Sequence, residues 1–138
     1  MSIPFQVYVR MPTLTQIMDS LSDDKSLALF NTIAISGGSS NTLIIRLNLT
    51  RKQYYSKISK MIKSGLIRRA HGRLLLTTFG KIIYEAHLTM GRAIECYWKL
   101  KAVDSLEVKE IPAEHYGELV QAITGHAEIA SFITKNLL

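Results

Sequence analysis

Residues 49–81 read LTRKQYYSKISKMIKSGLIRRAHGRLLLTTFGK. Thr50 suits the N-terminus of a helix, and Gly65 tolerates the left-handed conformation that often follows a last helical turn. The apolar residues between them fall within one arc of a helical wheel, and lysine, glutamine and serine fall opposite. The apolar set is Tyr54, Ile58, Met61 and Ile62. The stretch therefore predicts a helix over about 51–64 with one packing face and one basic face.

Two short apolar and basic segments follow this helix. They are joined by His71-Gly72, which suits a tight turn with a positive φ at the glycine. We therefore expect a β-hairpin over residues 66–76. Thr77 or Thr78 then begins a fourth helix, which we expect to reach about Lys101.

Helical patterns also lie upstream and downstream of this stretch. SDDKSLALFNTIAIS, residues 22–36, combines an N-terminal serine and two aspartates with apolar residues at helical spacing. GGSSN ends that helix, and NTLIIRLN, residues 41–48, predicts a second one. Two further helices are expected after Pro112, separated by Gly125. Near the start, Phe5, Val7 and Val9 alternate as in a strand or an ordered arm.

Three successive helices followed by a basic hairpin are the order of a winged helix-turn-helix. The predicted fold is mainly α, with a three-helix core, a short β-hairpin wing and a helical C-terminal extension. We expect an N-terminal arm or short helix over 1–21, the winged domain over 22–78, and a long helix with C-terminal helices over 79–138. In this arrangement the third helix enters the DNA major groove and the hairpin lies on the neighbouring backbone.

The net charge of +6 conceals a local excess of positive charge. Residues 1–24 hold one basic and three acidic side chains, residues 25–84 hold eleven basic and none acidic, and residues 85–138 hold five basic and eight acidic. Mixed signs would suffice for solubility, so this segment favours a polyanion-binding surface over a merely solvated face. Lysine and glutamine on a helix can reach guanine and adenine edges in the major groove.

The run LTRKQYYSKISKMIKSGLIRR...LLLTTFGKIIYEA resembles small archaeal winged helix-turn-helix transcriptional regulators. Their pattern is a Leu-Thr cap, a basic recognition helix with tyrosine, Gly-Leu-Ile, a wing, and Leu-Thr-x-x-Gly at the start of the next helix. The likeness covers about residues 22–100 and implies a regulator that binds double-stranded DNA, usually as a dimer. It lends the recognition-helix role to Arg51, Lys52, Gln53, Ser56, Lys57 and Lys60, and the wing role to Arg68, Arg69, His71 and Arg73.

Three more residues complete the predicted DNA-binding set: Thr50, Tyr55 and Lys63. Tyr55 either packs or offers its hydroxyl to a phosphate, and Lys63 either touches DNA or complements the helix dipole. The tip of the wing is only Ala70-His71-Gly72, which favours phosphate contact over deep insertion into the minor groove.

The fourth predicted helix carries an apolar seam. Its members alternate at spacings of four and three residues, as helix-packing seams do: Phe79, Ile83, Ala86, Met90, Ala93, Tyr97 and Leu100. A second apolar edge comprises Ile82, Leu88, Ile94 and Trp98. We expect a homodimer interface built from Ile83, Met90, Ala93, Tyr97, Trp98 and Leu100. The alternative is a seam covered by residues 112–137 of the same chain.

The sequence offers little for other chemistry. It lacks a nucleophile motif and a phosphate-binding glycine loop, so we expect no enzyme, and the lone Cys96 is expected to be buried. Histidines 71, 87, 115 and 126 lack metal-ligand spacing, so no metal or cofactor is predicted, and the sequence does not indicate an effector. The N-terminus lacks signal-peptide features, and no apolar run approaches the roughly 20 residues of a membrane span. A cytoplasmic protein without membrane contact is expected.

Two other functions stay open. One is a winged-helix module that holds a protein partner within a larger transcription or chromatin assembly, which an exposed basic helix face disfavours. The other is an architectural DNA binder without sequence preference.

Overall fold

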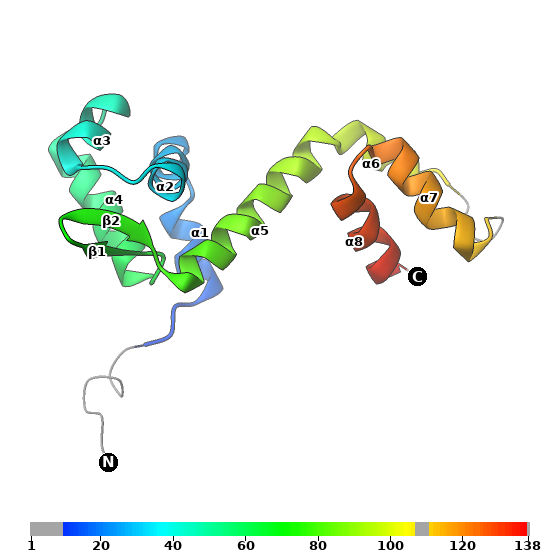
Figure 1. Ribbon diagram of the computed structural model, residues 1–138, viewed down its shortest axis with the longest axis horizontal. Helices are drawn as coiled ribbons and strands as arrows, with labels where there is room; N and C mark the ends of the chain where they lie inside the picture. Colours follow the sequence, from blue (N-terminus) through cyan, green and yellow to red (C-terminus); the bar gives the residue numbers. More distant parts are fainter. Residues whose placement is uncertain (1–9, 107–110, 138) are drawn as a thin grey trace, which may run out of the picture. The chain divides into compact units, whose positions relative to one another are not determined.

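The computed structural model describes residues 10–106 and 111–137, so the predicted alternation at Phe5, Val7 and Val9 lies outside them. The described chain is mainly helical, with one two-stranded antiparallel sheet (Figure 1). It divides into two compact units, residues 1–84 and 85–138. This arrangement is compatible with the predicted winged helix-turn-helix.

The first unit holds α1 (Leu14–Ser20), α2 (Asp24–Ile35), α3 (Ser40–Arg46), α4 (Arg51–Lys63), β1 (Ile67–Ala70) and β2 (Arg73–Leu76). Helix α5 (Thr78–Glu95) runs from the first unit into the second, which also holds α6 (Tyr97–Asp104), α7 (Ala113–Thr124) and α8 (Ala127–Leu137). The three helices predicted before the hairpin are α2, α3 and α4. All three are confirmed, as are the hairpin and the two helices after Pro112.

One hydrophobic core fills the first unit. It takes fully buried side chains from α2, α3, α4 and the hairpin: Leu29, Phe30, Leu43, Tyr54, Ile58, Met61, Leu66 and Ile67. Tyr54 was predicted to be a core residue, and its hydroxyl donates a hydrogen bond to the Ser40 hydroxyl at 3.0 Å. Ile62 departs from the predicted packing arc, because it lies at the edge of that arc and 37% of it is exposed.

The hairpin turns through two residues with positive φ. His71 has φ 52° and Gly72 has φ 74°, as in the two-residue turns that match the natural twist of β-strands. Ile67 pairs with Leu76 and Ala70 with Arg73. The predicted tight turn is confirmed, although histidine as well as glycine adopts the left-handed conformation.

The junction between the hairpin and α5 explains the Leu-Thr-x-x-Gly motif. The Thr77 hydroxyl donates to the Gly65 carbonyl and accepts from the Gly80 N–H at 2.8 Å, so it caps α5 and ties it to the end of α4. A Cβ at Gly80 would lie 1.9 Å from the Leu66 carbonyl oxygen. Only glycine therefore allows α5 to start this close to the chain that enters β1.

The second unit has a smaller core of its own, formed by Val103, Tyr116, Val120 and Ala130. Helices α7 and α8 are separated by Gly125, which has φ 73° and ends α7 as predicted.

The prediction of one continuous fourth helix is wrong at Cys96. The backbone turns at Cys96, so α5 ends at Glu95 and α6 begins at Tyr97. Helical hydrogen bonds persist on both sides of this kink, from Cys96 N–H to the Arg92 carbonyl and from Leu100 N–H to the Cys96 carbonyl. The thiol is buried, as predicted, and lies 3.5 Å from the Thr124 carbonyl oxygen. The kink thus occurs where the helix packs against the end of α7.

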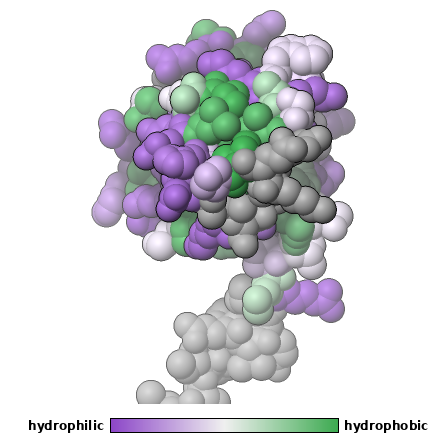
Figure 2. All heavy atoms as spheres, turned by 90° about the vertical axis from the view of Figure 1, so that its right-hand side faces the viewer, coloured by the Kyte–Doolittle hydropathy of each residue, from purple (hydrophilic) through white to green (hydrophobic). Residues whose placement is uncertain are grey.

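Large apolar side chains remain on the surface of the second unit. The exposed fractions are 51% for Met90 and Tyr97, 74% for Ile94 and 78% for Trp98. Figure 2 shows one face of this unit, on which an area of apolar surface lies among polar side chains. No helix within the described residues has the length and apolar character to cross a membrane.

Candidate nucleic-acid interface

The solvent face of α4 carries four polar side chains in one row. Lys52, Ser56, Ser59 and Lys63 are exposed and follow one another at spacings of four, three and four residues, so they share one side of the helix. Tyr54, Ile58 and Met61 occupy the opposite, buried side. We call these four residues the α4 stripe. Ser59 was missing from the predicted set, although its position on the helical wheel places it there.

The start of α4 is fixed by a reciprocal capping box. Thr50 Oγ1 accepts from the Gln53 N–H at 3.1 Å, and Gln53 Oε1 accepts from the Thr50 N–H at 3.0 Å. The predicted cap at Thr50 is confirmed. Gln53 is exposed, but its amide oxygen already serves the cap. A bidentate contact with adenine would compete with that hydrogen bond.

Lys57 points toward α2. Its ammonium lies 3.0 and 3.1 Å from the two Asp23 carboxylate oxygens and 3.1 Å from the Ser26 hydroxyl. Hydrogen bonds from the Ser26 hydroxyl and N–H, followed by the Lys57 ammonium, lower the pKa of Asp23 from 3.8 to about 2. Only 19% of the Lys57 side chain is exposed. The predicted contact residue thus supports the packing of α4 on α2.

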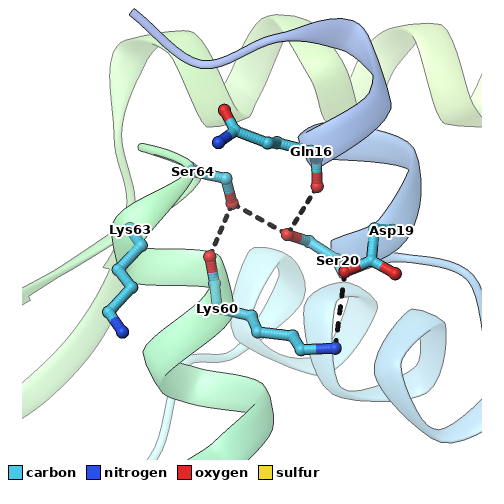
Figure 3. Close-up of a pocket in the computed structure, with 6 residues that line it drawn as sticks. All are labelled: Gln16, Asp19, Ser20, Lys60, Lys63 and Ser64. Carbon is cyan, nitrogen blue, oxygen red and sulfur yellow. Dashed lines mark hydrogen bonds and ion pairs between the residues drawn. The ribbon is translucent and has the colours of Figure 1, made fainter. Parts of the chain in front are cut away.

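Lys60 leans toward α1, as Figure 3 shows. Its ammonium lies 3.4 Å from an Asp19 carboxylate oxygen, while Lys63 points away from this pair. Beneath them the buried Ser20 and Ser64 hydroxyls hydrogen-bond to each other at 3.0 Å and fix α1 to the end of α4. A cleft of about 160 Å³ lies among these side chains.

Arg51 and Tyr55 lie at the edge of the exposed face. The Tyr55 ring meets the Tyr54 ring edge-on at 5.1 Å between centroids, and 45% of Tyr55 remains exposed. Both uses predicted for Tyr55, packing and contact through its hydroxyl, are compatible with this position. Arg51 is exposed in the first turn of α4.

Strand β1 of the hairpin packs against α4. The hairpin therefore adds its exposed cations beside those of α4. Directly paired residues share a face of a two-stranded sheet. The register pairs Arg68 with Leu75 and Ala70 with Arg73, so the two arginines lie on one face and Arg69, paired with the buried Leu74, on the other. His71 is exposed at the tip.

The resulting surface carries an excess of positive charge. On α4 and the hairpin, six exposed cations form no ion pair with another described residue: Arg51, Lys52, Lys63, Arg68, Arg69 and Arg73. The two carboxylates that reach α4, those of Asp19 and Asp23, come from before the acid-free segment 25–84. The two aspartates were absent from the predicted site. Asp23 is 34 positions from Lys57 and Asp19 is 41 positions from Lys60, and no local sequence pattern links residues so far apart.

Within residues 10–106 and 111–137, no cluster of three or more histidine, cysteine, aspartate or glutamate side chains has metal-binding geometry. We compared the chain with protein-family models, curated proteins and solved structures, and none of these comparisons gave a match.

Proposed function

We propose that this chain is a sequence-specific regulator of transcription that binds double-stranded DNA through a winged helix-turn-helix domain. The observation that carries the proposal is the exposed basic surface of α4 and the hairpin, which holds six unpaired cations and no carboxylate of its own segment. DNA phosphates supply the matching negative charge. The three-helix order and the hairpin after α4 supply an element of the right width for the major groove.

In this proposal the α4 stripe faces the base pairs. Lys52 and Ser56 lie in the first half of α4, the part of such helices that reaches base edges. Lysine donates to guanine O6 and N7, and serine can either donate or accept. Ser59 and Lys63 continue the row toward the groove wall, where a phosphate is the natural partner of the ammonium.

The hairpin then serves as a wing on the DNA backbone. Arg68 and Arg73 share one face of the sheet and can present guanidinium groups to neighbouring phosphates. The two-residue turn at His71 and Gly72 gives the wing little reach beyond its strands. Phosphate contact therefore suits it better than insertion into the minor groove.

The second unit supplies the homodimer contact in this proposal. Met90, Ile94, Tyr97 and Trp98 are each at least half exposed. Because about half of Tyr97 and most of Trp98 are exposed, each can bury only part of the about 150–250 Å² of an aromatic residue, toward the about 800 Å² per partner of a standard interface. Three other residues predicted at the interface are half-buried within the chain: Ala93 and Leu100 in the second unit, and Ile83, which packs on the core of the first. A dimer would place two α4 helices on two half-sites.

One observation favours a second function, architectural DNA binding without sequence preference. Gln53 is the one amide side chain in α4, and its oxygen is already used by the helix cap. The remaining stripe consists of lysine and serine, which discriminate less strictly between bases than a bidentate amide does. Such a protein would bind all duplexes through phosphates.

The experiment that separates these functions is selection of bound duplexes from a random DNA pool, followed by competition between a selected and a scrambled duplex. The proposal expects an enriched motif and a preference of at least about 10³ for it. Lys52→Gln should reduce that preference, whereas Arg73→Gln should weaken binding to both duplexes alike. Binding without an enriched motif would favour the architectural function, and no binding to any duplex would leave a protein-interaction module.

A further inference from the structure

Two aspartates reach α4 in different ways. Asp23 holds Lys57 through both carboxylate oxygens and shares it with the Ser26 hydroxyl, and 19% of the Lys57 side chain is exposed. Asp19 reaches Lys60 through one oxygen at 3.4 Å, with exposed fractions of 64% and 56% for the two side chains. The first pair belongs to the packing of the unit, and the second lies on its surface.

We propose that Asp19 determines affinity for DNA, because its carboxylate competes with a backbone phosphate for the Lys60 ammonium. This inference rests on the proposed function, since it assigns a role to a residue beside the same surface. Asp19 is a positioning residue that acts through Lys60 and does not itself touch DNA.

The surface pair is weak enough to be exchanged. Ion pairs between exposed side chains contribute about 0–1 kcal/mol, and this one has a single long contact. The cleft of about 160 Å³ beside it leaves the Lys60 chain room to move. In Figure 3 the Lys60 side chain extends from α4 across to Asp19 and borders that cleft.

Lys60 also lies close to where a phosphate would be. It directly follows Ser59 of the α4 stripe. It also precedes Lys63 by three residues, so the two lysines are neighbours on the helix surface. A phosphate at Lys63 is therefore within reach of a released Lys60. In the wild-type chain Asp19 opposes that release.

The charge change at Asp19 should alter the salt dependence of DNA binding. While Lys60 stays with Asp19 it neutralises no phosphate, so the wild type releases no DNA counterion at this position. In Asp19→Asn the free Lys60 releases one counterion per subunit, and the slope of log K against log salt should steepen by about 0.9 per subunit. Affinity at low salt should rise about twofold to fivefold per subunit, the value of a surface ion pair.

The test is a salt titration of binding to one duplex by four proteins: wild type, Asp19→Asn, Asp24→Asn and Asp19→Asn combined with Lys60→Gln. Asp24 is an exposed acid in the first turn of α2, so Asp24→Asn makes the same charge change without touching the Lys60 pair. We expect the steeper slope in Asp19→Asn only, and its loss when Lys60→Gln is added. Urea unfolding of the same variants checks that each stays folded, and Asp24→Asn should lose about 0.3–1 kcal/mol because Asp24 favours the N-terminus of α2.

Equal slopes for Asp19→Asn and Asp24→Asn would overturn the role of Asp19 while leaving DNA binding intact. A steeper slope that survives Lys60→Gln would also overturn it, since the effect would not pass through Lys60. Absence of duplex binding by the wild type would overturn both this inference and the proposed function.

Discussion

The two units of the chain differ in the size of their cores and in the sign of their charge. In the first unit, fully buried residues from three helices and the hairpin form one core, and an acid-free segment carries eleven basic residues. The second unit has a core of four buried residues, eight acidic against five basic residues, and large apolar side chains on its surface. The first unit is therefore suited to a negatively charged partner. In the second unit Ile94 and Trp98 offer an apolar contact, although Ile35 and Ile45 are equally exposed in the first.

Charge and apolar surface act on a partner in different ways, and this short chain carries both. Charge on an exposed helix attracts a polyanion over a distance and is sensitive to salt. Apolar side chains such as Ile94 and Trp98 act only on contact and tolerate salt. We expect changes in one unit to affect DNA binding or folding of that unit, and changes in the other to affect association.

The largest effect is expected at the start of α5. Gly80→Ala would place a Cβ 1.9 Å from the Leu66 carbonyl oxygen, so backbone must move, at a cost of about 3 kcal/mol or more. Gly91→Ala is the matched control in the same helix, because a Cβ there meets no described atom within 4 Å. It should gain up to about 1 kcal/mol from helix propensity. Urea unfolding measures both, and equal stabilities would contradict the tight junction.

The second unit is tested by removing its most exposed aromatic side chain. Trp98 is 78% exposed, so Trp98→Ala should leave helicity unchanged. If Trp98 lies in the dimer interface, its loss should cost about 2 kcal/mol of association, or about thirtyfold in the dimer dissociation constant. Sedimentation equilibrium measures this. Phe132→Ala, at 63% exposure on α8, is the control. A wild-type monomer at micromolar concentration would refute the homodimer.

A smaller effect is expected from the Asp23–Lys57 pair. The folded-state pKa of Asp23 is lowered to about 2, so its contribution to stability is present above about pH 4 and lost as the pH falls toward 2. Asparagine caps helices as well as aspartate does, so Asp23→Asn removes the charge and keeps the cap. With 49% of the side chain exposed, solvent screening limits the cost to about 1 kcal/mol at pH 7.

Urea unfolding of wild type and Asp23→Asn at pH 7 and pH 2 checks this prediction. The two proteins should differ at pH 7 and converge near pH 2. A difference that stays constant across this range would show that the hydrogen-bonding geometry, and not the charge, supports the contact between α2 and α4.

Local patterns were enough to predict most of the helices and the hairpin. Thr50 begins α4, Gly125 ends α7, and His71-Gly72 turns the hairpin, because each acts through its own backbone conformation or cap. The kink at Cys96 was not predicted, since the residues around it have no helix-breaking chemistry. It occurs where the buried thiol meets the end of α7, a contact 28 positions away.

The candidate site was predicted less completely than the fold. A helical wheel placed Lys52, Ser56 and Lys63 on the exposed face. Ser59 lies on the same face of that wheel but was not included in the prediction. The wheel could not indicate that Asp23 takes up Lys57 or that Asp19 takes up Lys60, because both partners come from other helices. Long-range ion pairs depend on tertiary packing, which hydrophobic periodicity does not encode.

We propose that the acid-free basic surface binds DNA, and a salt titration of duplex binding is the sharpest test of this role. If a dimer neutralises about eight phosphates, the slope of log K against log salt should be near −7, by counterion release at about 0.9 per phosphate. Unchanged stability across the same salt range would show that the protein remains folded. A slope shallower than about −2 would show that binding uses a surface other than α4 and the hairpin.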